Sequence, residues 1–437
     1  MIPASLGFTM VPKFQSPTIQ SPSISTSTST SMFSSTSNTP ITINPIVSKV
    51  KISKTVEIFS LVKQMQADGV EDITSLCVGE PDFPPPQAVL TAAAEAIQAC
   101  DTRYTAVTGT ADLREAIAED LKTRKGIEYD ATTEILVGNG AKQCVYQGIF
   151  ATCGPGDTVI VPAPYWPSYP EMVALSGASC KILETKEDDG YLITPEALRE
   201  CLESCKDTAK LLIFCNPSNP TGGVHELSRL KELANVLEDY PNVAILADEI
   251  YERLTYNDNG HDSFAAVSEN MFQRTMTING FSKAYAMTGM RLGYLAAPKH
   301  LAKAATTIQS QLTSCAGSVS QAAGVAALKN VPESEMEANV EIMREKRDYV
   351  ISRLEKMDGV TLAVPPTGAF YVLPDFSTYY DGDDGALCLD LLKEQKLALV
   401  PGSAFGADGT IRISYATSLE ELEVAMNKLE TFLESKK

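Results

Sequence analysis

The chain has 437 residues, of which 44% are hydrophobic, so it can bury a sizeable core, and its length suggests two or three domains. Its formal net charge of −19 is unsuited to binding the phosphates of nucleic acids or an anionic membrane surface. No uninterrupted apolar run reaches the roughly 18 residues that a membrane-spanning helix needs. We therefore expect a soluble protein with no nucleic-acid or membrane partner, acting on small molecules.

Cysteine and histidine content argues against metal chemistry. The ten cysteines are scattered without a CxxC pair, and His225, His261 and His300 are not spaced as a ligand pair. We expect most of the cysteines to be buried thiols in a reducing compartment. A zinc site and a Ser/His catalytic triad both lack supporting residues, so no metal is expected.

Residues 1–48 differ in composition from the rest of the chain. They are rich in Ser and Thr, Lys13 is their only charged side chain, and the first acidic residue is Glu57. A Ser-rich leader without acidic residues is typical of an organelle transit peptide, although this one has no Arg. A disordered tail that is retained is the alternative.

From about residue 86 the chain alternates amphipathic helical stretches with short apolar runs, a pattern typical of a largely parallel sheet covered on both faces. The expected strands are Ile135–Val137, Thr158–Val161, Leu211–Cys215, Val243–Ala247, Thr275–Ile278 and Leu292–Ala296. The expected helices between them include Ala111–Lys122, Pro195–Cys205 and Leu227–Leu237. Ligands bind at the carboxyl ends of the strands in such sheets, so residues that follow these runs are candidates for a site.

Beyond residue 298 the pattern changes to longer helices. A charged amphipathic helix is expected at Glu335–Lys356, a strand at Ala369–Leu373 and a last helix near Leu419–Leu433. This change indicates a second, smaller domain. The predicted organisation is a leader at 1–48, the N-terminal part of the small domain at 49–85, the large domain at 86–329 and the C-terminal part of the small domain at 330–437.

Two candidate residues follow the run at 243–247. Asp248 either aims its carboxylate into a ligand crevice or caps the N-terminus of a helix, and the position alone does not decide. Tyr251 lies three residues further on, so its phenol projects to the same side as Asp248 if a helical turn starts here.

Lys283 stands in the segment 279–293, among small residues, a hydroxyl and an arginine. Apolar neighbours and a nearby cation both lower the pKa of an amine, which is what a lysine that forms a Schiff base needs. Ser282 and Arg291 could then bind a phosphate, the arginine through its planar fork of donors.

Two further segments follow strands and present polar groups. The segment 137–143, VGNGAKQ, opens a helix, so its backbone N–H groups form an anion site; it matches neither GxGxxG nor GxxxxGK[ST]. The chain therefore lacks the dinucleotide-binding fingerprint that a nicotinamide dehydrogenase would carry. In the segment 215–223, CNPSNPTGG, prolines and glycines impose a rigid turn that either presents Asn219 or is purely structural.

Together these segments resemble the class I and II aminotransferases of the fold-type I pyridoxal-phosphate enzymes, from about Asn44 to the C-terminus. The motifs that carry the resemblance are Gly79-Glu-Pro-Asp-Phe83, Tyr104 before Gly109 and Leu113-Arg114, Pro164-Tyr-Trp166, Asn219-Pro-Thr-Gly222, Asp248-Glu-Ile-Tyr251, Ser282-Lys-x-x-x-Met-Thr-Gly-x-Arg291 and Arg412-Ile-Ser-Tyr-Ala416. The resemblance implies an α/β fold, with a mostly parallel seven-stranded sheet in the large domain and a smaller α/β domain. It also implies pyridoxal 5'-phosphate as the cofactor.

The resemblance assigns the ring of this cofactor to five residues. Lys283 would hold it as a Schiff base and move the proton of the substrate, and Asp248 would pair with the pyridine nitrogen. Tyr251 and Asn219 would hydrogen-bond the phenolic oxygen. Trp166, the only tryptophan, would cover the ring face.

The phosphate and the subunit partner are implied in the same way. The phosphate would be held by Gly140, Ala141 and Lys142 through their N–H groups, together with Ser282 and Arg291. Tyr104 resembles the residue that reaches this phosphate from a partner subunit, which would make a homodimer part of the active site. Relatives commonly carry tryptophan where this chain has Met290, so we expect altered packing there without loss of chemistry.

Substrate residues follow from the resemblance as well. Arg412 would clamp the α-carboxylate, with the Gly79 backbone and the side chains of Trp166 and Asn219 nearby. Thr55 and Lys142 match the residues that meet a distal carboxylate in bacterial aspartate aminotransferases and plastid prephenate aminotransferases.

The implied activity is transamination between amino and oxo acids. Its substrates would be aspartate or glutamate with 2-oxoglutarate or oxaloacetate, and prephenate would be converted to arogenate. Alanine, aromatic or kynurenine aminotransferases, a lyase that makes aminocyclopropane carboxylate, and a non-catalytic binding module are the alternatives. With the leader, the resemblance to plastid-type enzymes favours the plastid stroma over the mitochondrion or the cytosol.

Overall fold

The computed structural model describes residues 41–52, 54–257 and 260–436. Residues 44–437 form one compact unit, which is described here by itself. The predicted leader lies outside the described residues up to position 40, and Ser53 lies outside them too. Within the described part of the chain, no helix is both long enough and apolar enough to cross a membrane.

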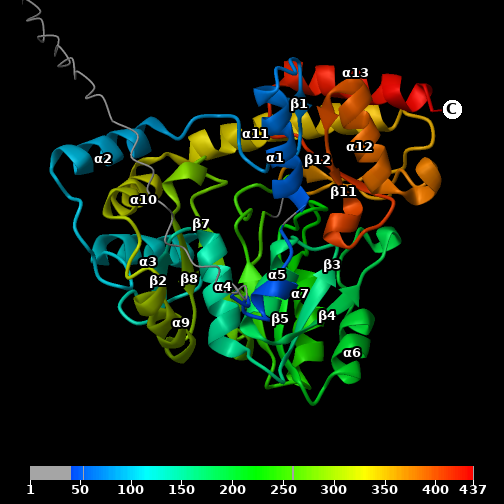
Figure 1. The fold of residues 1–437 in the computed structure, drawn as a ribbon. Helices are drawn as coiled ribbons and strands as arrows, with labels where there is room; N and C mark the ends of the chain where they lie inside the picture. The colour runs from blue at the N-terminus through cyan, green and yellow to red at the C-terminus, as the bar shows by residue number, and fades with distance from the viewer. Residues whose placement is uncertain (1–40, 53, 258–259, 437) are drawn as a thin grey trace, which may run out of the picture. The chain divides into compact units, whose positions relative to one another are not determined.

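A seven-stranded sheet forms the centre of the unit (Figure 1). The strand order is β2-β8-β7-β6-β5-β3-β4, and only β8 runs antiparallel to its neighbours. This confirms the mostly parallel seven-stranded sheet. The strands are β2 (Ile135–Gly138), β3 (Thr158–Ala163), β4 (Ser179–Glu184), β5 (Ala209–Cys215), β6 (Ala244–Asp248), β7 (Thr275–Gly280) and β8 (Gly293–Ala296).

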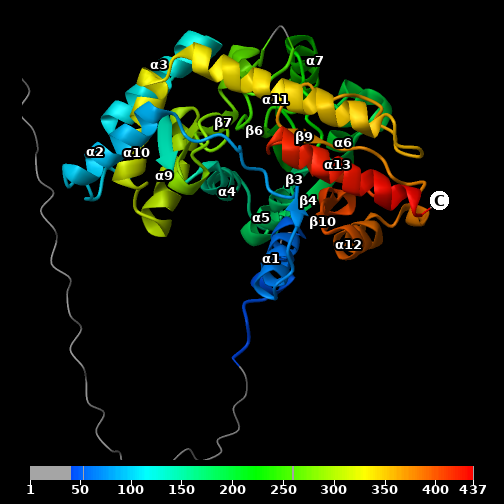
Figure 2. The ribbon, with the colours of Figure 1, turned by 90° about the horizontal axis from the view of Figure 1, so that it is seen from above.

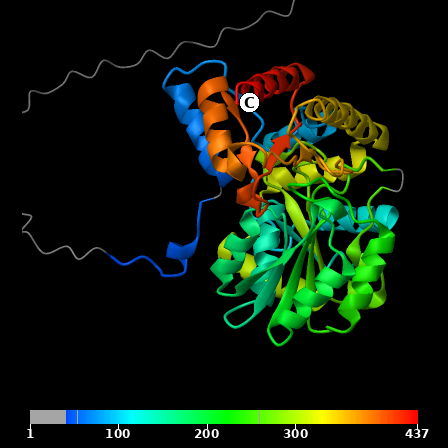
Figure 3. The same cartoon turned by 90° about the vertical axis from the view of Figure 1, so that its right-hand side faces the viewer.

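Helices cover both faces of the sheet, as Figure 3 shows for its green strands. Alternate side chains of a strand point to opposite faces, so Val159 and Val161 join one buried cluster while Ile160 joins another. The first face packs against α4 (Ala141–Thr152), α5 (Ser168–Ser176) and α9 (Lys299–Leu312). The other packs against α6 (Pro195–Ser204), α7 (Leu227–Glu238), α2 (Gln87–Gln98), α3 (Ala111–Lys125) and α10 (Ser318–Asn330).

The N-terminal segment packs with the C-terminal part of the chain. Strand β1 (Thr74–Ser75) pairs with β10 (Leu397–Ala398), and β9 (Tyr371–Val372), β11 (Val400–Pro401) and β12 (Ile411–Ser414) form a second small sheet. Around them lie α1 (Lys54–Ala67), α11 (Glu333–Leu354), α12 (Asp384–Gln395) and α13 (Leu419–Glu434). Figure 2 shows α11 and α13 side by side, over a core that both helices share. The domain boundaries set out above remain predictions.

Several expectations needed correction. Strand β4 was missed because it is an edge strand whose side chains are mostly exposed, so it has no apolar run. Helix α3 continues past the expected end at Lys122 to Lys125, where Gly126 ends it in the left-handed conformation with φ 67°. Five of the ten cysteines are buried, fewer than expected.

The helix-cap alternative for Asp248 is wrong, because β6 ends at this residue and a turn follows. Within that turn, the Ile250 N–H donates to Asp248 Oδ1 at 3.3 Å. The carboxylate therefore organises a turn, and no helix begins there.

Candidate active site

The carboxyl ends of β2, β5, β6 and β7 meet at one edge of the sheet and border a cavity of about 320 Å³. All of the predicted site residues except Gly140 and Tyr104 line it. They come from distant parts of the chain: Thr55, Gly79, Ala141, Lys142, Trp166, Asn219, Asp248, Tyr251, Ser282, Lys283, Arg291 and Arg412.

Lys283 lies just after β7, and its ammonium faces the cavity. Its Nζ donates to the Gly79 carbonyl at 2.5 Å and lies 5.9 Å from the centre of the Phe370 ring. Burial lowers the pKa of Lys283 to about 8, while Glu80 opposes the shift and Arg412 and Arg291 add to it. About a tenth of this amine is therefore in its neutral, nucleophilic form at pH 7, far more than for a lysine of ordinary pKa.

Asp248 ends β6 as a buried carboxylate at the floor of the cavity. Its Oδ2 accepts a hydrogen bond of 2.7 Å from the phenol of Tyr169, a residue of α5 that is 2% exposed. Burial raises the pKa of Asp248, and the Tyr169 hydrogen bond opposes the rise. Tyr169 in turn meets the Trp166 ring edge to face, with centroids 5.3 Å apart.

Arg412, on β12, is 3% exposed and is held between two aromatic rings. Its guanidinium carbon lies 4.5 Å from the Tyr371 centroid and 4.8 Å from that of Phe405. Nη2 donates to the Cys77 carbonyl at 2.5 Å and Nη1 donates to Asn219 Oδ1 at 3.1 Å. Its Nε has no hydrogen-bond partner among the described residues. A guanidinium so fixed in place, with donor capacity left, suits a carboxylate ligand.

The start of α4 forms the anion site expected from its sequence. Gly140 precedes the helix with φ 90°, and no described side chain caps the first N–H groups. A Cβ at Gly140 would lie 2.6 Å from Arg291 Nη2, so only glycine lets this guanidinium approach the helix N-terminus. Ser282 also borders this end of the cavity. The arrangement offers backbone, hydroxyl and guanidinium donors to one anion.

The segment that starts at Gly79 closes another side of the cavity. A Cβ at Gly79 would lie 1.8 Å from the Tyr371 hydroxyl, which itself meets the Tyr251 hydroxyl at 2.9 Å. Glu80 contacts the hydroxyl of Thr288 and also lines the cavity. Close packing against Tyr371 therefore requires glycine at position 79.

A second cationic group stands near the mouth of the cavity. The Lys142 ammonium lies 5.2 Å from the centre of the Trp166 ring, and burial and then Arg291 lower its pKa. Thr55, in the first turn of α1, lines the same cavity. The cavity thus carries Arg412 deep inside and Lys142 at a separate position.

Of the two predicted site residues that do not line the cavity, Gly140 lies against Arg291, whereas Tyr104 is not brought to the site. Its side chain is 90% exposed. Sequence reasoning also missed lining residues, among them Glu80, Tyr169, Cys215 and Tyr371. Glu80 could have been found, because it belongs to the Gly79-Glu-Pro-Asp-Phe83 motif. Tyr371 carries no local signal, since it lies in an otherwise ordinary apolar stretch, whereas Tyr169 lies only three residues after Trp166 of the 164–166 motif.

Comparison with known proteins agrees with this geometry. The family model described as "Aminotransferase class I and II" matches residues 71–429. An aspartate aminotransferase of Pinus pinaster is 46% identical over 90% of this chain and 81% of its own length. A bifunctional aspartate aminotransferase and glutamate/aspartate-prephenate aminotransferase of Petunia hybrida is 44% identical over 90% of this chain and 83% of its own length.

Solved structures give the same result. The aspartate aminotransferase of Rhizobium meliloti superposes with a TM-score of 0.85 at 35% identity, covering 90% of this chain and 99% of that one. The Thermus thermophilus enzyme with maleate gives 0.83 at 35% identity, with the same coverage. The chain therefore belongs to the class I and II aminotransferases, enzymes that use pyridoxal 5'-phosphate.

Proposed function

We propose that this aminotransferase acts on acidic amino acids, exchanging amino groups between aspartate or glutamate and 2-oxoglutarate or oxaloacetate, and that it also converts prephenate to arogenate. The observation that carries the proposal is the pair of cations in one cavity, Arg412 and Lys142. Each can meet one carboxylate of a dicarboxylic substrate, and the flexible lysine can serve substrates of differing length. The names of the plant relatives support the same substrates.

The residues around the cavity fit pyridoxal 5'-phosphate. The uncapped start of α4, with Arg291 against Gly140, provides donors for the phosphate. Asp248 provides a buried carboxylate for a protonated ring nitrogen, and Lys283 provides an amine of lowered pKa for the aldehyde. Trp166 would lie against the ring face, and Tyr251 and Asn219 would contact its oxygen.

When bound, the cofactor supplies an electron-withdrawing ring that accepts the electrons released as an amino acid loses its α proton. Arg412 binds the α-carboxylate in a bidentate pair and so fixes the substrate's orientation. The Lys283 amine would take the proton from the α carbon of the substrate and return it to the cofactor carbon that had carried the aldehyde. Asp248 would hold a proton at the ring nitrogen, and the hydrogen bond from Tyr169 orients that carboxylate and limits the rise in its pKa.

A substrate panel tests the proposal. Aspartate, glutamate, alanine, phenylalanine and kynurenine are each assayed as donors with 2-oxoglutarate and with oxaloacetate, and prephenate is assayed with aspartate and glutamate as donors. We expect kcat/KM for aspartate to exceed that for alanine. We also expect Lys142→Met to lower kcat/KM for aspartate about tenfold while changing that for alanine little. Equal turnover of alanine, or a Lys142→Met variant with unchanged preference, would overturn the acidic assignment.

Tyr104 supports the proposal of a homodimer. Its side chain is 90% exposed and lies away from the cavity lining of its own chain. We infer that it reaches the phosphate site of the partner subunit. Sedimentation should show a dimer, and Tyr104→Phe should weaken cofactor affinity without changing the dimer. A monomer with full activity would contradict this inference.

The Ser- and Thr-rich leader supports plastid import, and its residues 1–40 lie outside the described residues. In an import assay with isolated chloroplasts, the full chain should be shortened and protected from added protease. A chain that begins at Asn44 should stay outside. Import into mitochondria alone would contradict the plastid assignment.

A further inference from the structure

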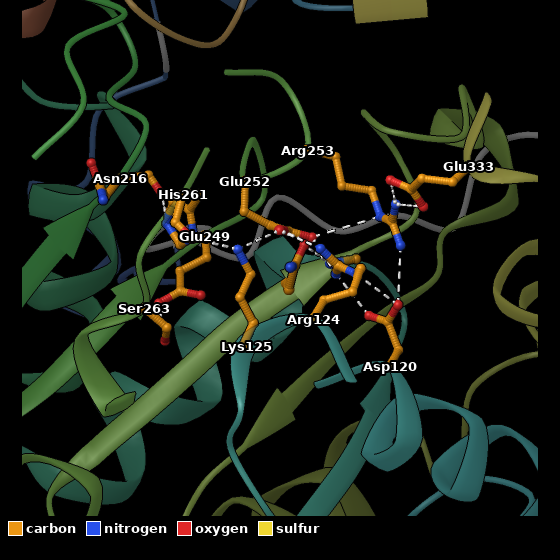
Figure 4. A network of polar contacts seen from close by, with 12 residues as sticks. Asp120, Arg124, Lys125, Asn216, Glu249, Glu252, Arg253, His261, Ser263 and Glu333 are labelled. Atoms are coloured by element: carbon orange, nitrogen blue, oxygen red, sulfur yellow. Dashed lines mark hydrogen bonds and ion pairs between the residues drawn. The ribbon is translucent and has the colours of Figure 1, made fainter. Parts of the chain in front are cut away.

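The turn after β6 has two sides. Asp248 and Tyr251 line the cavity, whereas the carboxylates of Glu249 and Glu252 take part in a buried polar network behind it (Figure 4). Glu249 is 2% exposed and Glu252 is 6% exposed. One short segment therefore supplies groups both to the candidate active site and to this network.

Lys125, at the end of α3, is the branching point of the network. Its side chain is 7% exposed, and its Nζ lies 3.0 Å from Glu252 Oε2. The same ammonium lies 2.9 Å from both Nδ1 and the carbonyl of His261. Arg124 also holds Glu252, with two contacts of 2.7 and 2.8 Å. Lys125 thus joins the turn after β6 to the segment that carries His261.

The hydrogen bonds of His261 are fixed by this neighbour. An ammonium can only donate, so Nδ1 accepts from Lys125 and the ring proton resides on Nε2. Burial and then Lys125 lower the pKa of His261 to about 3, which keeps the ring neutral. Nε2 therefore donates to the Asn216 carbonyl, at 3.0 Å.

Asn216 is the first residue of the turn that carries Asn219. Its N–H donates to the Asp248 carbonyl at 3.0 Å, and its side chain binds the main chain of His225. The Gly222 N–H donates to the Ser218 carbonyl at 3.0 Å and the Ser218 N–H donates to the Gly223 carbonyl at 2.9 Å, so main-chain bonds close the turn around Asn219. A displacement at Asn216 would therefore reach Asn219, whose Oδ1 accepts from Arg412.

We propose that Lys125 and His261 are positioning residues for the transamination site. They fix the turn that carries Asn219 against the turn that carries Asp248 and Tyr251, and so set Arg412 for the substrate carboxylate. The inference rests on the proposed role of Arg412 in binding the α-carboxylate. It does not depend on which amino acid is the substrate, because every amino acid has that group.

The effect should be strong because the bonds are buried. A surface hydrogen bond can be replaced by water, but a buried group that loses its partner keeps the cost of its lost hydration. Without Lys125, His261 Nδ1 has no donor, and the ring can turn away from Asn216. Without the His261 ring, the Asn216 carbonyl loses its donor.

Four variants test the proposal in the holoenzyme. Lys125→Met removes the branching point, and Lys122→Met on the same helix is its control, because Lys122 forms an exposed pair with Glu128 at 2.9 Å. His261→Leu removes both bonds of the ring, and His261→Gln can restore them with its amide nitrogen and oxygen. Kinetic assays give kcat and KM for the amino acid that the wild type uses best. Calorimetry gives the Kd of maleate, a dicarboxylate that does not react. Thermal unfolding gives the midpoint temperature.

We expect Lys125→Met and His261→Leu to raise KM and the maleate Kd about tenfold, with a smaller change in kcat. Lys122→Met should match the wild type, and His261→Gln should lie near it. KM and Kd that stay within about twofold of the wild type in both disruptive variants, while the thermal midpoint falls, would show a purely structural role and overturn the proposal. A His261→Gln variant as impaired as His261→Leu would also overturn it.

If Lys125→Met does not fold, the two His261 variants decide the question. Failure of the proposed substrate assignment is a separate result. In that case the wild type turns over another amino acid and does not bind maleate, but the KM comparison with its best substrate still tests the positioning role.

Discussion

Arg412 and Lys283, on the cavity side of the turn after β6, are less fully paired than Glu252 on its far side, where burial raises the pKa of Glu249 to about 7. On the cavity side, Arg412 keeps an unpartnered Nε among the described residues, and Lys283 donates to a single carbonyl. On the far side, Glu252 is bound by Arg124 and Lys125, and Arg124 also binds Asp120. Buried charges are normally paired, so unused capacity at a group that lines the cavity leaves it available to a ligand.

The same contrast appears in the pKa values. Burial alone would raise the pKa of Glu252, but Lys125 and Arg124 hold it well below its ordinary value. At Lys283 burial lowers the pKa to about 8, and among the residues that the structure describes, Glu80 and Asp248 oppose this shift without restoring the ordinary value. Pairing thus stabilises a fixed charge behind the site, while incomplete pairing leaves a titratable amine within it.

Removing Lys283 should abolish the activity of the cavity without affecting the network on the far side of the turn. We expect Lys283→Ala to lose transamination by at least about 10⁴-fold, because both the amine that binds the cofactor and the proton carrier are gone. Stability should not fall, since the lysine is a buried amine with one hydrogen bond. A transamination assay measures the loss of activity. Borohydride labelling and absorption spectra of the reconstituted protein show whether the cofactor is still bound to a lysine. An amine at position 283 that borohydride leaves unlabelled in the wild type would falsify the account.

Removing the charge of Glu252 should instead destabilise the fold, through the network on the far side of the turn. Glu252→Gln leaves Lys125 and Arg124 with less compensating charge in a buried place, and we expect the free energy of unfolding to fall by about 3 kcal/mol. Urea unfolding measures the change. Glu333→Gln is the control, because Glu333 pairs with Arg253, which also lies 3.8 Å from Glu252, but the Glu333 side chain is 63% exposed. This substitution should lower the free energy of unfolding by less than about 1 kcal/mol. An equal fall in the free energy of unfolding in both variants would show that the buried pairs of Glu252 stabilise the fold no more than the exposed pair of Glu333.

The pH dependence of cofactor binding sharpens the contrast. Only the neutral amine of Lys283 attacks an aldehyde, and its pKa of about 8 lies below its ordinary value. Below pH 8 the amine is mostly protonated, so the rate of reconstitution of the cofactor-free protein should rise about tenfold per pH unit. Above pH 8 it should level off. Stopped-flow absorbance records the rate, and a rise that continues to pH 10 would show an unshifted lysine.

The sheet could be predicted from its apolar runs, and some cavity residues could be predicted because they stand at the ends of those runs, whereas Arg412, Thr55 and Gly79 were implied only by the family resemblance. Lys283, Asp248 and Asn219 all stand at such positions, and the structure brings them to one cavity. Strand β4 could not be predicted, since its mostly exposed side chains give no apolar run. The roles assigned to the site residues remain predictions.

The network behind the site lay beyond sequence reasoning for a different reason. Lys125 lies past the expected end of its helix, and His261 had been considered only as a candidate metal ligand. Their partners are distant in sequence: Lys125 and His261 are 136 residues apart. A charged residue near a helix end is usually solvated, and only the packing of three segments reveals that this one is buried.

Tyr169→Phe probes the boundary between the two sides and should have the smallest effect. The Tyr169 phenol donates to Asp248 at 2.7 Å, and this bond limits the rise in the pKa of that carboxyl that burial causes. Without the bond the pKa of Asp248 would rise further, so the carboxylate would draw the shared proton away from the ring nitrogen of a bound cofactor, and we expect kcat to fall about fivefold with little change in KM. Tyr129→Phe is a matched control, because Tyr129 is also buried but its hydroxyl meets Thr277 away from the cavity. If both variants lose kcat equally, the loss comes from packing, and Tyr169 does not act through Asp248.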